Sequence, residues 1–246
     1  MSKNNFFTRE YYMSPAECNG EQEMPLWLLA NRMIEVATLH ANSWNVGYKR
    51  LRKENQAWVL SRLTIEMERY PKVGENYSLV TWIESYNRHF SERNFEVLDE
   101  NGEVVGYGRS IWSVINSTTR ESCDISNLYN NMIDYVAEKD CPIAKQSKMR
   151  PITFQRQANH VFLYTDIDFN RHVNALKYIC LILNQWSLDF FDQKAIKRFE
   201  IAFVKECYAE DEVTIGVEDH EDFSSAEIQC NGDTLCRSKL TFKERK

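Results

Sequence analysis

The same order of elements occurs twice along this 246-residue chain: an apolar helical stripe is followed by several short runs typical of strands. In the first half, apolar residues recur every three or four positions from Leu26 to His40, which predicts an amphipathic helix beginning near Pro25. In the second half the same spacing extends from Val173 to Trp186. A helix followed by antiparallel strands is an α+β arrangement, so we predict two domains of similar design.

Strands are predicted on both sides of each helix. One run precedes each helix, at residues 6–13 in the first half and 155–164 in the second. Four runs follow the first helix, at 58–67, 77–84, 90–98 and 104–115. Four more follow the second helix, at 199–207, 212–217, 224–229 and 234–242. Turn-forming residues separate the runs, among them Asp99-Glu100-Asn101-Gly102 and Asn231-Gly232.

The segment between the halves, residues 126–151, is polar, has mixed charge and contains Pro142 and Pro151. We predict that it is a linker between an N-terminal domain at 1–125 and a C-terminal domain at 152–246. Half of the chain, about 120 residues, is large enough to bury its own apolar core.

Charge and composition exclude several classes of function. The net charge of −6 disfavours nucleic acid as the main partner, because phosphate binding needs an excess of basic residues on one face. No apolar stretch is long enough for a signal peptide or a membrane span, so we expect a cytoplasmic protein without membrane insertion. Seven cysteines without a C-x-x-C pair argue against a disulfide framework and against a thiolate zinc site, so we expect no metal site.

Polar residues capable of chemistry are densest between a predicted strand and the second helix. Asp168, Asn170 and His172 alternate there, so their side chains can share one face of an extended loop. Histidine changes protonation near neutral pH, and a helix N-terminus offers N–H donors to an oxyanion. Helix capping would explain one Asp or Asn at this place, whereas several together with a histidine favour a reactive site.

The segment 168–178, Asp-Phe-Asn-Arg-His-Val-Asn-Ala-Leu-Lys-Tyr, closely resembles the D-x-N-x-H-V-N-N-x-K-Y segment of plant and bacterial acyl-acyl carrier protein thioesterases. The resemblance continues through residues 58–63, 68–74, 81–82 and 109–120, and residues 199–207 are similar to the family's L-E-Y-R-R-E-C strand. It thus covers nearly the whole chain. The departures are Ala175, where many relatives have a second asparagine, and Tyr208, where a glycine often follows Glu-Cys.

The resemblance implies two tandem hotdog domains, each a long helix wrapped by an antiparallel sheet. It also implies a hydrolase of fatty acid metabolism that needs no cofactor, with an acidic acyl carrier protein as partner and the fatty acyl chain held by the first half. The family's polar network corresponds to Asp168, Asn170, His172 and Glu206. Glu206 would activate water, Asn170 and His172 with backbone N–H groups near Val173 would bind the carbonyl, and Asp168 would hold His172.

A thiol nucleophile is the alternative mechanism, built from Cys207 with His172 and Asn170. On a regular strand Glu206 and Cys207 would point to opposite faces, so only one could reach the site, and we favour Glu206. In the first half Arg69-Tyr70 stands roughly where Glu206-Cys207 stands in the second, and the loop at 14–24 has no histidine. Chemistry is therefore expected in the second half.

Other functions on the same fold are an acyl-CoA thioesterase, a hydroxyacyl dehydratase and a non-catalytic acyl-binding module. The sequence leaves open the preferred chain length, carrier protein against coenzyme A as acyl carrier, and pairing into a homodimer. Three groups of basic residues are candidates for docking an acidic carrier protein: Lys49-Arg50 with Arg52-Lys53; Lys194, Lys197 and Arg198; and Lys145, Lys148 and Arg150 of the linker.

Overall fold

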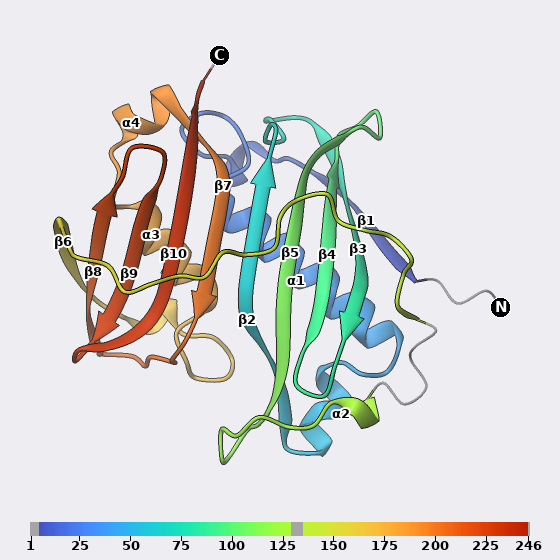
Figure 1. Ribbon diagram of the computed structural model, residues 1–246. Helices are drawn as coiled ribbons and strands as arrows, with labels where there is room; N and C mark the ends of the chain where they lie inside the picture. Colours follow the sequence, from blue (N-terminus) through green and yellow to red (C-terminus); the bar gives the residue numbers. More distant parts are fainter. Residues whose placement is uncertain (1–4, 129–134, 246) are drawn as a thin grey trace. The chain divides into compact units, whose positions relative to one another are not determined.

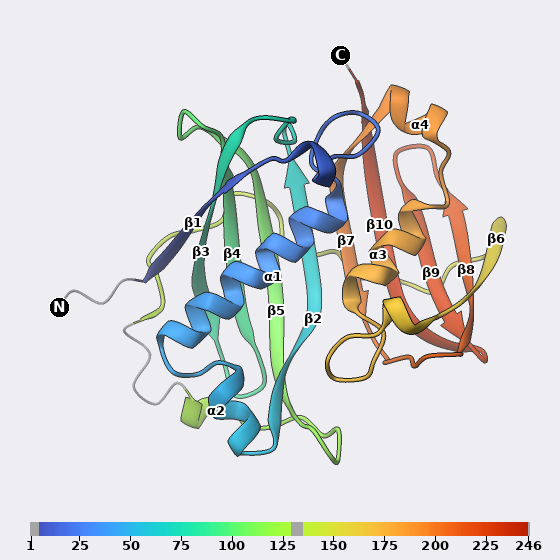
Figure 2. The same ribbon diagram turned by 180° about the vertical axis from the view of Figure 1, so that it is seen from behind.

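The computed structural model describes residues 5–128 and 135–245, so part of the predicted linker, residues 129–134, lies outside the described residues. The chain divides into two compact units, Met1–Lys145 and Gln146–Lys246. In the described part of each unit, five antiparallel strands form a sheet that carries a helix on one face (Figures 1 and 2).

The first unit contains the strand order β1-β3-β4-β5-β2. Its elements are β1 (Phe6–Tyr12), α1 (Leu26–Ser43), α2 (Tyr48–Lys53), β2 (Gln56–Met67), β3 (Asn76–Tyr86), β4 (Ser91–Leu98) and β5 (Val104–Asn116), with short 3-10 turns at Pro15–Glu17 and Ser126–Leu128. The long helix and all five strands fall where the sequence predicts them, whereas the short helix α2 was not predicted.

Helix α1 lies across one face of this sheet (Figure 2). Its buried side chains, which include Leu29, Met33 and Val36, follow the spacing that the sequence predicts. Gly108 on β5 permits the close approach, because a Cβ added there would lie 2.8 Å from Met33 and 3.2 Å from the ring of Phe95. The apolar stripe of α1 therefore packs directly onto the strands.

The second unit contains the strand order β7-β10-β9-β8-β6. Its elements are β6 (Arg156–Val161), a 3-10 turn at Tyr164–Asp166, α3 (Ala175–Leu183), α4 (Leu188–Gln193), β7 (Lys194–Phe203), β8 (Glu212–Asp219), β9 (Ser224–Cys230) and β10 (Asp233–Glu244). Asn231 and Gly232 both have positive φ, 51° and 84°, as the predicted two-residue hairpin turn between β9 and β10 requires.

The second helix is shorter than its sequence pattern predicts. The Asn174 side chain accepts a hydrogen bond from the Leu176 N–H and caps α3, while Val173 forms an isolated bridge with Ile167. At the other end Ser187 caps the separate helix α4, which the sequence did not reveal. The apolar periodicity therefore continues through residues that are not helical.

Strand β7 also ends earlier than predicted, at Phe203 and not at residue 207. The N–H groups of Val204 and Lys205 both donate to the carbonyl of Leu235, at 2.8 and 3.2 Å, so the regular ladder stops there. Residues 204–208 form an irregular segment. The alternation argument that separated Glu206 from Cys207 is therefore wrong, because it assumed a regular strand.

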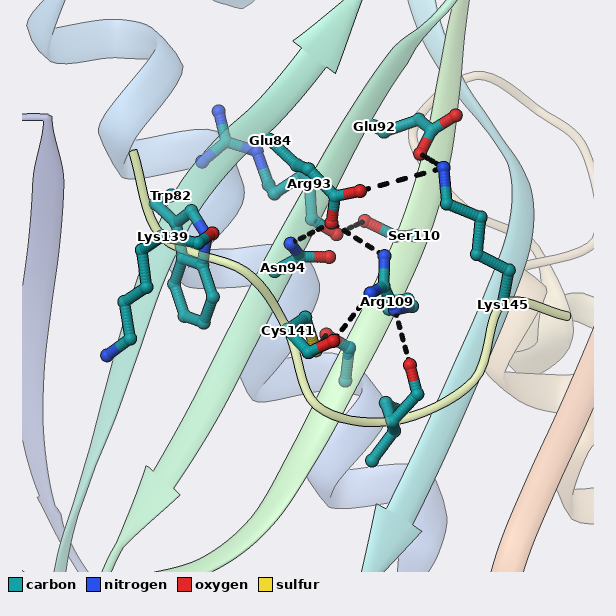
Figure 3. A network of polar contacts seen from close by, with 12 residues as sticks. Trp82, Glu84, Glu92, Arg93, Asn94, Arg109, Ser110, Lys139, Cys141 and Lys145 are labelled. Atoms are coloured by element: carbon teal, nitrogen blue, oxygen red, sulfur yellow. Dashed lines mark hydrogen bonds and ion pairs between the residues drawn. The ribbon is translucent and has the colours of Figure 1, made fainter. Parts of the chain in front are cut away.

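The segment leading out of the first unit crosses the face of the sheet opposite α1 and is held there by side chains of the sheet (Figures 1 and 3). Arg109 donates to the carbonyls of Cys141 and Ile143 at 2.7 and 2.9 Å, and the Trp82 indole donates to the carbonyl of Lys139 at 2.8 Å. The side chains of Cys141 and Ile143 are buried beneath the segment against Trp82. Within the described residues, no helix is both long enough and apolar enough to cross a membrane.

Candidate active site

The loop before α3 is held in a single shape by hydrogen bonds within it. The Asp168 N–H donates to the His172 carbonyl at 2.8 Å, and Arg171 adopts a left-handed φ of 67°. The Asp168 carboxylate accepts from the N–H groups of Asn170 and His172, at 2.7 and 3.4 Å. Asp168 therefore fixes the backbone that carries His172 and does so without a hydrogen bond to its ring.

A backbone hydrogen bond joins this loop to the segment after β7. The Val173 N–H donates to the Cys207 carbonyl at 2.9 Å. The adjacent side chains consequently meet: His172 Nδ1 lies 3.5 Å from Glu206 Oε1. The His172 side chain is 19% exposed and that of Glu206 35%, so both are partly shielded yet open to water.

Asp211, which the sequence did not single out, orders the segment that bears Glu206. Its carboxylate accepts from the Tyr208 N–H at 2.9 Å and from the Cys207 thiol at 3.2 Å. The Tyr208 ring in turn meets the His172 ring edge-on, with centroids 5.2 Å apart. In the sequence, the only sign of this role is that Asp211 follows Cys207 by four residues.

The structure does not place every group as the sequence suggested. The Asn170 side chain is exposed, and its contact with Asp168 is made by its backbone. The Val173 N–H, expected to help bind a carbonyl, is already used by the Cys207 carbonyl, which comes from a segment distant in sequence. The Val173 N–H itself is therefore not available to an oxyanion, whereas the role expected for other backbone N–H groups near Val173 stays a prediction.

Cys207 has the surroundings of a neutral thiol. Its side chain is 1% exposed and donates to Asp211. Burial, with the Asp211 carboxylate adding to it, raises the pKa of Cys207 to about 12. Since a nucleophilic cysteine requires a thiolate at working pH, this environment opposes the thiol mechanism.

The donor atoms of Cys207, Asp211 and Cys230 lie within 4.8 Å of one another. Such a set could surround a metal ion, but the Asp211 carboxylate is already hydrogen-bonded to Cys207 and Tyr208. We therefore interpret the contact of Asp211 with Cys207 as part of the order of the segment beside Glu206.

Asp166 links the loop to both of its neighbouring elements. Its carboxylate lies 3.2 Å from Lys177 Nζ on α3 and 3.7 Å from His160 Nε2 on β6, and accepts from the Leu163 N–H. Although burial alone would raise the pKa of Asp166, the Leu163 N–H and Lys177 outweigh it and leave the pKa below its usual range. Asp166 is therefore a charged anchor of the loop.

The first unit contains the same loop with different side chains. The Asn19 N–H donates to the Glu23 carbonyl at 2.9 Å and Gln22 has a φ of 60°, as Asp168 and Arg171 do at the matching places in the second unit. The position of the histidine is thus occupied by Glu23.

The same comparison locates the counterpart of Glu206. The Met24 N–H donates to the Pro71 carbonyl at 2.8 Å, which matches the bond to the Cys207 carbonyl in the second unit. The residue before Pro71 is Tyr70, so Tyr70 corresponds to Glu206. The register expected from the sequence was one residue out, and the first unit has neither the histidine nor the glutamate.

Both halves match models of one protein family. Residues 4–133 match the acyl-ACP thioesterase N-terminal domain and residues 151–244 match the C-terminal domain of the same family. Among curated proteins, the chain is 25% identical over 214 residues to the palmitoyl-acyl carrier protein thioesterase of Gossypium hirsutum and 26% identical over 230 residues to oleoyl-acyl carrier protein thioesterase 1 of Arabidopsis thaliana. These matches include 82% and 86% of this chain but only 52% and 62% of the two relatives, so the chain spans about half to three fifths of their length.

Solved structures agree over the whole chain. The acyl-ACP thioesterase of Bacteroides thetaiotaomicron is 34% identical, with a TM-score of 0.92 over 99% of this chain and 100% of that one. The 12:0-ACP thioesterase of Umbellularia californica, 21% identical, has the same fold, with a TM-score of 0.87 over 99% of both chains. The predicted fold of two tandem hotdog domains is thus confirmed, and the chain belongs to the acyl-ACP thioesterase family.

Proposed function

We propose that the protein hydrolyses the thioester that joins a fatty acyl chain to acyl carrier protein, releasing the free fatty acid. The observation that carries the proposal is the contact of His172 with Glu206 within the family's signature segment. The chain's membership of the family supplies the substrate class. A dehydratase or a non-catalytic acyl-binding module is less well supported, because a basic carboxylate beside an imidazole in a partly open site suits the activation of water.

Glu206 acts as the general base in this proposal. Its carboxylate takes a proton from water, and the resulting hydroxide attacks the thioester carbonyl carbon. The tetrahedral oxyanion is stabilised by side-chain donors, for which His172 and the exposed amide of Asn170 are available. The C–S bond then breaks and the departing thiolate accepts the proton from Glu206. Because thiols ionise near pH ~8.5, the leaving group needs little acid assistance.

Thiol release from purified protein tests the activity. We expect free thiol and free fatty acid to form in equal amounts from dodecanoyl-acyl carrier protein, with a lower kcat/KM for dodecanoyl-coenzyme A. Binding of both substrates without thiol release would instead indicate that the protein is a non-catalytic acyl-binding module. A higher kcat/KM for the coenzyme A ester would instead support the acyl-CoA thioesterase. The cytoplasmic location and the pairing of two copies stay predictions.

Replacement of Cys207 by serine separates the two mechanisms. We expect Cys207→Ser to retain at least about a third of wild-type kcat, because general-base catalysis by Glu206 does not use the thiol. Rapid-quench mass spectrometry of the wild-type protein during turnover should show no acylated protein. An acyl adduct on Cys207, or a loss of activity of about 10³-fold in the serine variant with an unchanged circular dichroism spectrum, would establish the thiol as nucleophile.

A further inference from the structure

The segment that crosses the sheet is held differently in the two units. In the first unit, anchoring contacts occur at every second residue: the carbonyls of Lys139, Cys141 and Ile143 accept from the sheet, and Lys145 Nζ lies 2.6 Å from Glu92 Oε2 (Figure 3). Apolar side chains fill the space beneath the segment. This part of the segment is closed against its sheet.

In the second unit the segment is anchored only at its two ends. The Ser147 hydroxyl donates to Glu200 at 2.5 Å, and the Thr153 N–H donates to Glu218 at 3.2 Å. Between these anchors, no hydrogen bond of residues 148–152, all of them described, ties the segment to the sheet. A groove of about 390 Å³ lies here, between the segment and strands β8, β9 and β10.

Several basic side chains line this groove. Lys148 and Arg150 project from the segment and Lys239 from β10. Among the described residues none of these three has an acidic partner within ion-pair distance, although Lys239 Nζ lies 4.0 Å from the centre of the Phe223 ring. Arg237 also lines the groove but is neutralised by the buried Glu227 at 2.6 Å. One carboxylate, that of Glu218, faces these cations.

Apolar side chains accompany the charges. Met149 and Ile152 on the segment and Phe223 beside β9 also line the groove. A groove with separated cations and apolar contacts suits an acidic surface that carries exposed apolar side chains better than a single small anion. The positive groove is notable in a chain whose net charge is −6.

We infer that this groove is a docking surface for the acidic carrier protein that delivers the acyl chain. The inference rests on the proposed function for the identity of the partner. The inference favours one of the three groups of basic residues that the sequence suggested as docking surfaces, namely Lys148 and Arg150 of the linker. Lys194 is paired with Glu244 and Arg198 with Glu200, so that group is largely neutralised. Lys145 is likewise bound, to Glu84 and Glu92.

The short helix α2 is the competing surface. Lys49, Arg52 and Lys53 are exposed there, and Arg50 has only a weak contact with Glu54 at 3.5 Å. Tyr48 is exposed beside these cations, and Arg52 donates to its hydroxyl at 2.6 Å and lies over its ring. This helix therefore offers charge with a single aromatic side chain, whereas the groove combines its cations with three apolar side chains. Its exposed lysines supply a matched control, since reversing two of them changes the net charge by the same amount as reversing two cations of the groove.

The test compares Lys148→Glu/Arg150→Glu with Lys49→Glu/Lys53→Glu on two substrates. For the groove variant we expect kcat/KM for dodecanoyl-acyl carrier protein to fall about tenfold and its salt dependence to weaken, because rim charges act mainly on encounter rate. Hydrolysis of dodecanoyl-pantetheine should stay within about twofold of wild type, which also shows that the site is intact. The α2 variant should keep carrier kcat/KM within the same limit.

Binding of the unacylated carrier protein, measured by calorimetry, gives a readout that does not depend on hydrolysis. If neither thioester is hydrolysed but the groove variant alone loses carrier binding, the proposed function fails and the docking surface stands. Equal losses in both variants would mean unspecific attraction and would overturn the inference. A loss confined to the α2 variant, or no loss in either, would place docking elsewhere. If neither variant changes carrier binding but inorganic phosphate binds in the groove, the groove is a small-anion site and the inference fails.

Discussion

Glu206→Gln is expected to lower kcat for acyl-carrier hydrolysis by about 10²–10⁴-fold while leaving KM nearly unchanged. The amide has the size of the carboxylate and can face His172 at a similar distance, but it cannot accept the proton of water. The loss should therefore fall on the chemical step. Steady-state kinetics with dodecanoyl-acyl carrier protein, together with circular dichroism, would measure it.

Glu210→Gln is the matched control, because Glu210 is an exposed glutamate four residues further along the same segment. It should retain kcat within about twofold, since it contacts no group of the site. His172→Ala and Asp168→Ala belong to the same series and should each lower kcat at least about tenfold. Near-normal turnover by Glu206→Gln with an unchanged fold would remove the proposed base.

Arg109→Met is expected to lower the free energy of unfolding by about 2–4 kcal/mol. The Arg109 side chain is 15% exposed, and its guanidinium contacts Glu84 Oε2 at 2.6 Å in addition to the two carbonyls of the crossing segment (Figure 3). Methionine keeps much of the volume but removes the donor of the two carbonyls and one of the partners of the partly buried Glu84 carboxylate, which retains Asn94 and Lys145. Urea unfolding followed by tryptophan fluorescence would report mainly on the first unit, where five of the six tryptophans lie.

The pH dependence of that loss follows from Glu84. Burial alone would raise its pKa, but Asn94, Arg109 and Lys145 together hold the pKa below its usual range. A lowered pKa stabilises the fold above the ordinary glutamate pKa of about 4.3, and the contribution disappears as pH falls through the folded value. The difference between wild type and Arg109→Met should therefore be greatest at neutral pH and shrink in acid.

Arg50→Met serves as the control for this experiment. Its guanidinium lies 3.5 Å from Glu54 on an exposed helix, so its removal should change the free energy of unfolding by less than about 0.5 kcal/mol. A loss for Arg109→Met no larger than that of Arg50→Met would show that the crossing segment does not need the arginine.

The sequence predicted those parts of the fold that depend on local pattern. Helix α1 buries residues at regular intervals, so its periodicity was sufficient. The strands of the first unit were recognisable as apolar runs bounded by turn residues, although β2 does not bury its side chains in regular alternation. It could not predict the end of β7, because the carbonyl of Leu235 that stops the ladder comes from another strand. The early end of α3 similarly depends on a cap by Asn174, whereas the apolar periodicity continues beyond the helix.

The candidate site shows the same limit. The motif located His172 and Glu206 in segments that the structure brings together. It could not show that the Val173 N–H is already used, or that Asp211 orders the segment beside Glu206, because both facts depend on contacts between distant segments. Residue types could be recognised from the sequence, but the availability of each hydrogen-bonding group could not.

The same loop shape occurs in both units, at residues 19–24 and 168–173, and this has a consequence for how such a chain can evolve. One backbone shape occurs with Glu23 and Tyr70 in the first unit and with His172 and Glu206 in the second, so the shape tolerates either pair. After a gene duplication, one copy of the loop can therefore drift away from the reaction without unfolding its domain. Descendants that have lost the activity should still fold and still be found by overall similarity, and only the residues at these two positions would distinguish them from working enzymes.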